Sequence, residues 1–231
     1  MFTGLIEATG KILSIHPADG TTRLRVAGPA ALLQRLHTGD SIAVSGVCLT
    51  ALDIDAKANS FGADLAAATL TRTSLAHLHV GSIINLELPT PAGTPLGGHI
   101  VQGHVDGVGH LQSLEPVASS GDATTTDWWL RVSIPAHCAR YVVDKGSITI
   151  EGISLTVARL TVAQLTTRTD ETVVTVNIIP HTYAATNLHT LALGSPLNIE
   201  VDVLAKYAER LAAEKASQSA LTLESLIANG Y

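Results

Sequence analysis

The residues best suited to chemistry gather in one glycine-rich stretch, residues 96–110, where five glycines and three histidines fall within fifteen positions. Glycine lets the backbone approach a ligand closely, and an imidazole exchanges protons near neutral pH. A single histidine is more often a structural hydrogen-bonding group than a catalyst, but the surrounding glycines favour His104 as a candidate for proton transfer. His99 and His104 lie five residues apart without the further cysteine or histidine partners of a zinc site. We therefore expect no metal here.

Cys48 is the second chemical feature, because its surroundings recur 106 residues later around Ser154. A cysteine is nucleophilic when deprotonated, whereas a serine hydroxyl forms hydrogen bonds. The alternative interpretation of Cys48 is a small buried hydrophobic residue. Thr50 and Thr156 follow two positions later on the same strand faces and extend a polar edge that suits a flat heterocycle. Two similar pockets that differ at one reactive position suggest two copies of one ligand, handled differently.

Glu200 and Asp202 lie two positions apart and would share one face of a strand. The ordinary interpretation of this pair is a solvated strand edge. If the face points into a cleft instead, its carboxylates could hold a polyhydroxylated ligand.

The elements that position these residues form a duplicated unit. Residues 41–50 and 147–156 share Ser, Ile, Gly, Leu and Thr at a constant separation of 106 residues. Further matches occur at separations of 99 residues upstream and 113 residues downstream, and the first change of separation falls in a turn-rich insertion at 119–126. Each half has roughly a hundred residues, the usual size of one compact domain. We therefore expect two homologous domains in tandem.

Apolar residues alternate with polar ones in both halves, which is typical of half-buried strands. Short strands between Gly and Asp turns predict a small antiparallel barrel in each half. The Ala- and Leu-rich segments 29–36 and 65–70 are better interpreted as short helical connections. From residue 204 on, helical spacing predicts an amphipathic helix that mediates oligomerisation or folds back on its own barrel. The alternating positions include Leu24, Val26, Ile42, Val44, Ile84, Leu86, Leu130, Val132, Ile148, Ile150, Leu197 and Ile199.

The composition excludes several classes of function. With 46% hydrophobic and 15% charged residues the chain of 231 residues is globular, and its net charge of −6 gives no footprint for a nucleic acid or an anionic membrane. No phosphate-loop motif and no G-x-G-x-x-G between a strand and a helix is present. Cys48 and Cys138 occupy non-equivalent repeat positions, which favours a reducing cytosol over a disulfide framework. The N-terminus lacks the pattern of a signal peptide and no apolar run is long enough for a membrane span, so we expect a soluble, cytoplasmic protein.

Seven motifs distributed over nearly the whole chain are specific in combination. They are Met-Phe-Thr-Gly-Leu-Ile-Glu (1–7), Ser-Gly-Val-Cys-Leu-Thr (45–50), Gly-Gly-His-Ile-Val-Gln-Gly-His-Val-Asp-Gly (97–107), Lys-Gly-Ser-Ile (145–148), Glu-Gly-Ile-Ser-Leu-Thr-Val (151–157), Ile-Pro-His-Thr (179–182) and Asn-Ile-Glu-Val-Asp (198–202). In these motifs the chain resembles the riboflavin synthase family. The resemblance implies a mainly β fold: two tandem, homologous, six-stranded Greek-key-like antiparallel barrels that bind lumazine (1–97 and 98–203), then a C-terminal oligomerisation helix (204–231).

The resemblance also implies an activity. Two molecules of 6,7-dimethyl-8-ribityllumazine exchange a four-carbon unit and give riboflavin and 5-amino-6-ribitylaminouracil, the last step of riboflavin biosynthesis. A transferase of this kind needs no metal or redox cofactor, because one substrate ring donates electrons to the other. The family is homotrimeric, and its active site forms where the first barrel of one subunit meets the second barrel of its neighbour. Lumazine synthase is a further candidate partner; a nucleic acid and a membrane are not.

The resemblance assigns site residues to two substrates. One substrate would contact Gly4, Leu5, Ile6, Cys48, Leu49, Thr50, Asp64, Leu65, Ala66, Ala67, Ala68 and Thr69. The other would contact Gly103, His104, Val105, Lys145, Ser154, Leu155, Thr156, Ile178, Ile179, Pro180, His181, Thr182 and Tyr183. His104 would lead the proton transfer, and the supporting or nucleophilic candidates are Cys48, Ser41, Ser154, Thr156, Asp202 and Phe2. The chain departs from the family at Ala68, where Glu is frequent, so one carboxylate for the ribityl chain is missing.

Three other functions are compatible with parts of this sequence. A non-catalytic lumazine- or flavin-binding antenna protein would use the same double barrel but lose polar groups in one barrel, and only Ala68 favours it. A flavin-dependent reductase would need a nucleotide-binding α/β domain after the barrel, where this chain has a helix. A structural scaffold would bind no ligand at all.

Overall fold

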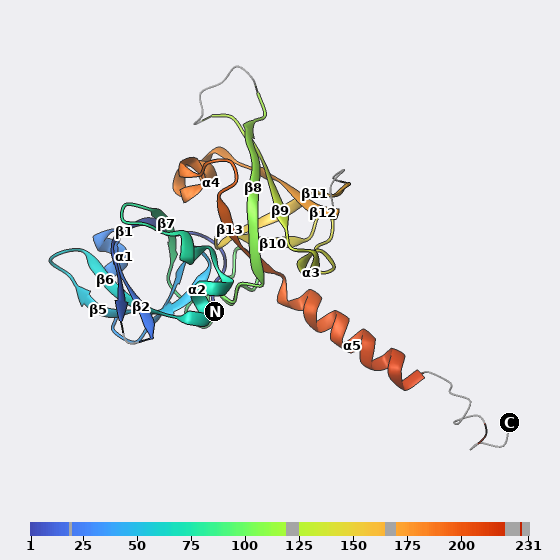
Figure 1. Ribbon diagram of the computed structural model, residues 1–231, viewed down its shortest axis with the longest axis horizontal. Coiled ribbons are helices and arrows are strands. Elements are labelled where there is room, and N and C mark those ends of the chain that lie inside the picture. The colour runs from blue at the N-terminus through green and yellow to red at the C-terminus, as the bar shows by residue number, and fades with distance from the viewer. Residues whose placement is uncertain (19, 119–124, 165–169, 220–226, 228–231) are drawn as a thin grey trace.

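Two β-barrels lie next to each other and one long helix projects from the second (Figure 1). The computed structural model describes residues 1–18, 20–118, 125–164, 170–219 and 227. Most of the predicted insertion at 119–126 and residues 220–226 and 228–231 of the predicted helix lie outside the described residues. The predicted fold class is confirmed.

The first barrel contains seven strands and three short helices. The strands are β1 (Ala8–Ala18), β2 (Thr21–Ala27), β3 (Ser41–Val44), β4 (Val47–Thr50), β5 (Leu52–Asp55), β6 (Ser60–Ala66) and β7 (Ile83–Glu87). The helices are α1 (Ala30–Leu33), α2 (Ala67–Arg72) and η1 (Ser74–His77).

The second barrel repeats this order. Its strands are β8 (Gly107–Pro116), β9 (Trp128–Ile134), β10 (Ser147–Ile150), β11 (Ile153–Gln164), β12 (Asp170–Ile178) and β13 (Pro196–Val201). Its helices are α3 (Ala136–Ala139), α4 (Pro180–Ala185) and η2 (Asn187–Thr190), and α5 (Val203–Ser219) follows the last strand.

The two barrels have the same topology, although their strand numbers differ. The second is a closed barrel in the order β10-β11-β12-β9-β8-β13. The first is a seven-stranded sheet in the order β4-β3-β7-β1-β2-β6-β5. Its two outermost strands, β4 and β5, are joined directly through Ala51, so together they correspond to β11. Asp53 in β5 has a φ of 45°, a left-handed conformation that interrupts regular strand pairing. Six strand positions therefore describe both halves.

Each barrel is filled by its own apolar core. The alternating residues predicted from the sequence, such as Leu24 and Val26 in one barrel and Leu130 and Val132 in the other, are buried, except that Trp128, which begins the pattern in β9, is half-buried. The helical prediction for 65–70 is wrong at its start, because Leu65 packs in the first core and belongs to β6, which ends at Ala66. The helix begins at Ala67.

The barrels are joined by an exchange of two equivalent segments, which we call the exchanged segments: residues 2–6 and 101–105. Phe2 and Val101 form a bridge through backbone hydrogen bonds of 2.7 and 3.1 Å. Residues 2–6 then continue along the second barrel, where Ile6 packs on the second core, and residues 101–105 continue along the first, where Val105 packs on the first core. Each barrel is therefore completed by chain from the other half.

The helix α5 projects away from the second barrel (Figure 1). Asp202 accepts a hydrogen bond of 2.9 Å from the backbone N–H of Leu204 and so caps the first turn. Lys206 forms an ion pair with Asp106 at 2.6 Å. Leu204, Tyr207 and Leu211 remain 57–62% exposed, which contradicts the alternative that the helix folds back on its barrel. None of the helices in the described ranges is long and apolar enough to cross a membrane.

Candidate functional site

A pocket of about 250 Å³ lies where the exchanged segment 101–105 crosses the first barrel. It combines Cys48 of β4 and Ala68 and Thr69 of α2 with Gly103, His104 and Val105 of the other half. These six residues are all among those predicted from the sequence. The pocket also contains Val47, Arg72 and Thr73, which the sequence prediction missed. Arg72 lies one helical turn after Ala68, which would have been a usable signal.

Gly103 allows this pocket to form, because the segment passes very close to β4. The backbone oxygen of Gly103 accepts a hydrogen bond of 2.9 Å from the N–H of Cys48. Gly103 has a φ of +77°, and a Cβ added there would lie 2.7 Å from the Cβ of Cys48. Only glycine fits this conformation at this distance. His104 is consequently held beside Cys48 at the mouth of the pocket.

Glu200 anchors the same segment from β13. Its carboxylate accepts backbone N–H bonds from Gln102, Gly103 and His104 at 2.7, 3.0 and 3.0 Å. Glu87 does the same for the first segment, with bonds of 2.6 and 3.0 Å from the N–H groups of Thr3 and Gly4. The interpretation of Glu200 as a solvated edge is therefore wrong: its residue is only 3% exposed. Desolvation raises the pKa of Glu200 to about 7 against the opposing effect of the three N–H donors.

This raised pKa predicts a pH-dependent stability. Because the folded-state pKa of Glu200 lies above its ordinary value of 4.5, the folded protein holds the proton more tightly than the unfolded chain. The contribution of Glu200 to the free energy of unfolding is therefore complete below about pH 4.5 and decreases as the pH rises through about 7, by on the order of 3 kcal/mol. Urea unfolding of the protein and of Glu200→Gln between pH 4.5 and 8 measures it through Trp128 and Trp129, which both lie in the second barrel. Parallel pH profiles would refute the assignment.

The equivalent place in the second barrel has a different chemistry. The other exchanged segment crosses β11, and the backbone oxygen of Gly4 accepts a 2.8 Å hydrogen bond from the N–H of Ser154. The hydroxyl of Ser154 bonds the Nδ1 of His99 at 2.7 Å, and the Nε2 of His99 bonds the hydroxyl of Thr149 at 3.0 Å. Burial lowers the pKa of His99, with Asp202 acting in the opposite direction. The lowered pKa favours the neutral imidazole, which lies between the hydroxyls of Ser154 and Thr149.

The sequence prediction missed this role of His99 and considered it only as a metal ligand. No signal from the repeat could have found it, because the equivalent position in the first half would precede Met1. No group of three or more histidine, cysteine or carboxylate side chains in the described part of the chain is arranged to hold a metal ion.

The predicted grouping of residues into two substrate sites needs a correction. Gly4, Leu5 and Ile6 were expected beside Cys48, and Gly103, His104 and Val105 beside Ser154. The structure has the reverse, because each segment crosses to the opposite barrel. Cys48 and His104 therefore belong to one pocket, and Ser154 belongs with Gly4 and His99.

The remaining predicted residues fall into three groups. The side chains of Phe2, Leu49, Leu65, Leu155 and Ile178 are buried, so these residues can offer a ligand only their backbone. The side chains of Asp64, Tyr183 and Asp202 have other partners: Arg23 at 2.6 Å, the Trp128 ring at 4.1 Å and the first turn of α5. Side chains that are exposed or half-exposed around the two crossings belong to Ser41, Thr50, Ala66, Ala67, Lys145, Thr156, Ile179, Pro180, His181 and Thr182.

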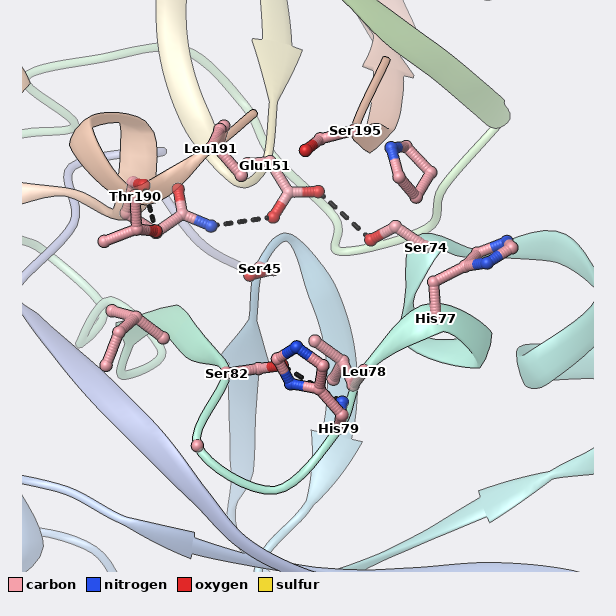
Figure 2. A pocket seen from close by; sticks show the side chains of 14 residues that line it. Ser45, Ser74, His77, Leu78, His79, Ser82, Glu151, Thr190, Leu191 and Ser195 are labelled. Carbon is pink, nitrogen blue, oxygen red and sulfur yellow. Dashed lines mark hydrogen bonds between the residues drawn. The ribbon is translucent and has the colours of Figure 1, made fainter. Parts of the chain in front are cut away.

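A further pocket of about 300 Å³ lies between the barrels and contains none of the predicted substrate residues (Figure 2). Glu151 projects into it and accepts hydrogen bonds from the hydroxyl of Ser74 and from the amide of Asn187, both at 3.1 Å. Complete burial raises the pKa of Glu151. Gly46 and Gly152 meet nearby, with no room for a Cβ on either. We interpret this hydrogen-bond network as the contact that holds the two barrels in a fixed position relative to each other.

The fold defines a class: a tandem of two related β-barrels, with chemically different side chains at the two crossings, the places where an exchanged segment crosses the opposite barrel. A family model described as Lumazine binding domain matches residues 3–89 and 102–202. Riboflavin synthase of Actinobacillus pleuropneumoniae is 40% identical over 234 residues, 100% of both chains. Riboflavin synthase of Mycobacterium tuberculosis (strain ATCC 25618 / H37Rv) is 43% identical over 213 residues, 91% of this chain and 98% of the relative. The chain belongs to the riboflavin synthase family.

Solved structures with this fold include LumP complexed with 6,7-dimethyl-8-(1'-D-ribityl) lumazine, with a TM-score of 0.71, and LumP complexed with riboflavin, with a TM-score of 0.73. Each is 24% identical and covers 87% of this chain and 99% of the solved chain. At this identity the likeness concerns the fold alone.

Proposed function

We propose that this protein is a riboflavin synthase, a transferase that converts two molecules of 6,7-dimethyl-8-ribityllumazine into riboflavin and 5-amino-6-ribitylaminouracil. The observation that carries the proposal is the unequal pair of sites on equal barrels: Cys48 with His104 in one and Ser154 with His99 in the other. A dismutation requires this arrangement, because it binds one compound twice and treats the two copies differently. A carrier protein would need neither pair.

In the proposed reaction a base removes a proton from the C7 methyl group of one lumazine, and the carbanion attacks the second ring. The four-carbon unit then leaves one ring and completes the third ring of the flavin, while the donor ring becomes the aminouracil. One ring is oxidised and the other reduced, so no external oxidant enters the balance. Holding the two rings face to face offsets the loss of their translational freedom.

The residues of the two crossings have proposed roles. His104 moves the proton at the methyl carbon, and Cys48, at the same pocket, is the supporting nucleophile. His99 and Ser154 form the corresponding polar pair for the other substrate. Arg72, which has no ion-pair partner within the described residues, is suited to the hydroxyl groups of the ribityl chain in place of the carboxylate missing at Ala68.

We further propose a homotrimer in which the first barrel of one subunit meets the second barrel of its neighbour. The apolar face of α5, formed by Leu204, Tyr207 and Leu211, supports this because it is uncovered in a single chain. Domain boundaries at 97 and 203 and a cytoplasmic location, which suits the two free cysteines, belong to the same proposal, as does lumazine synthase as a partner.

Replacement of Leu204, Tyr207 and Leu211 by serine is expected to convert the oligomer to monomers and to abolish riboflavin formation, because the subunits then no longer share sites. Sedimentation equilibrium measures the mass. Val143→Ser, at a residue 61% exposed in the second barrel, is the matched control and should change neither mass nor activity. An unchanged mass in the triple variant would refute the role of α5.

The function itself is tested by incubating the full-length protein anaerobically with 6,7-dimethyl-8-ribityllumazine as the sole added compound. Riboflavin should appear, as measured by its fluorescence, because the second substrate molecule accepts the electrons. Tight lumazine binding without flavin formation would indicate the antenna protein, and Ala68→Glu would then be the first substitution to make.

A further inference from the structure

The outer face of the second barrel has a pocket of about 450 Å³. It lies over β8, β9, β11 and β12. None of its lining residues is among those assigned to the two lumazine sites. Its volume is within the range of small-molecule sites in proteins. The proposed synthase activity therefore gives this pocket no role.

Two arginines flank one threonine across this face. Arg131 of β9 lies directly opposite Thr175 of β12, and Thr175 lies directly opposite Arg159 of β11. Adjacent strands are about 4.8 Å apart, and both arginine side chains are exposed and line the pocket. Two guanidinium groups and a hydroxyl are thus within reach of one small anion.

Neither arginine is paired with a carboxylate among the residues that the structure describes. Within the described ranges, Arg131 and Arg159 form no ion pair, and no hydrogen bond of their side chains is found. Ser113 continues the row on β8 opposite Arg131, but its buried hydroxyl also lacks a partner. Glu115 is the one carboxylate among the lining residues, and it lies opposite Trp129. Among the described residues, the row therefore holds two guanidinium groups and two hydroxyls, and no carboxylate is paired with either arginine.

The first barrel provides an internal comparison, because the arginines on the corresponding face have hydrogen-bond and ion-pair partners there. Arg25 stands at the position equivalent to Arg131, but Asp53 replaces Arg159. Asp53 pairs with Arg23 at 3.1 Å, and its backbone oxygen accepts a bond of 2.6 Å from Arg25. The carboxylate that neutralises the first face is therefore exchanged for a second cation in the second barrel.

The residue of the second barrel that corresponds to Arg23 is Trp129. It lines the pocket and is 39% exposed. An exposed indole offers a flat apolar surface for stacking on an aromatic ring. An arginine guanidinium binds a phosphate group through two or more hydrogen bonds. Two guanidinium groups and a threonine hydroxyl together offer more donors than a single carboxylate can accept. We propose that this pocket binds a small aromatic compound that carries a phosphate group, with the phosphate between Arg131 and Arg159 and the ring on Trp129.

Calorimetric titration of the full-length protein with adenosine 5′-monophosphate tests the site. Saturable binding is expected, with binding by adenosine or inorganic phosphate at least about tenfold weaker, because each retains only half of the recognised groups. Arg131→Gln, Arg159→Gln and Trp129→Leu should each weaken binding by about tenfold or more. Arg25→Gln, the equivalent change in the first barrel, is the matched control and should leave it unaltered.

The site also predicts a separation from catalysis. Arg131→Gln and Arg159→Gln should keep normal riboflavin formation, since neither residue touches a substrate crossing. Absence of saturable binding of adenosine 5′-monophosphate would overturn the proposal, and so would binding that is unchanged in the Arg131→Gln/Arg159→Gln double variant. Binding by adenosine as strong as by its phosphate would also overturn it, because the arginines would then not hold the ligand.

Discussion

His104→Ala is expected to lower the turnover number for riboflavin formation by roughly a hundredfold to ten-thousandfold, the usual contribution of a positioned proton-transfer group. The side chain of His104 lies at the mouth of the Cys48 pocket, and the backbone of this residue is fixed by Glu200 rather than by the imidazole. Lumazine binding in the first barrel should therefore change little. Steady-state kinetics and equilibrium titration of the same preparation separate the two effects.

His110→Ala is the matched control for this prediction. His110 is an exposed residue of β8 and lines none of the pockets described here. Its replacement should leave both turnover and binding unchanged. If His104→Ala turned over at the normal rate, His104 would be a structural residue, and the proton would have to be moved by another group.

Gly103→Ala is expected to reduce activity at least as strongly, and for a different reason. The added methyl group would lie 2.7 Å from the Cβ and 2.8 Å from the N of Cys48, so the exchanged segment must move. The movement breaks the bond between Gly103 and Cys48 and displaces His104. We expect a loss of stability of about 1–3 kcal/mol together with loss of lumazine binding, measured by urea unfolding and titration.

Gly39→Ala is the control that separates two effects of Gly103→Ala: the steric clash with Cys48 and the backbone strain at a positive φ. Gly39 has a φ of +96°, comparable to the +77° of Gly103, but an added Cβ meets nothing within 4 Å. Its replacement should cost stability only and leave activity intact. Equal losses of activity in the two variants would mean that the close approach to Cys48 has no special role.

The repeat in the sequence was sufficient to predict both barrels. Alternating residues such as Ile42 and Ile148 lie on the buried side of their strands, because a period of two leaves only one apolar face. The family resemblance named six of the nine residues of the Cys48 pocket, including His104, but it placed Gly103, His104 and Val105 in the other site. The interruption between β4 and β5 was not predictable, since it depends on a left-handed conformation at Asp53.

The exchange of segments could not be predicted from the sequence. Gly4 and Gly103 occupy equivalent repeat positions whether each segment stays on its own barrel or crosses to the other, so the pattern is identical for both arrangements. The burial of Glu200 has the same origin, because its N–H donors come from the crossing segment. The role of His99 depends on a contact with Ser154 across 55 residues of sequence, which no local pattern encodes.

A dismutation at two unequal sites of a single kind of chain consumes and produces compounds in a fixed ratio, so a mass balance is the decisive measurement. The purified protein is mixed with 6,7-dimethyl-8-ribityllumazine alone, and substrate, riboflavin and 5-amino-6-ribitylaminouracil are quantified by chromatography over time. One flavin and one pyrimidine should form for each pair of lumazines consumed. Lumazine that stays bound and unconverted, or flavin formed without an equal amount of pyrimidine, would contradict it.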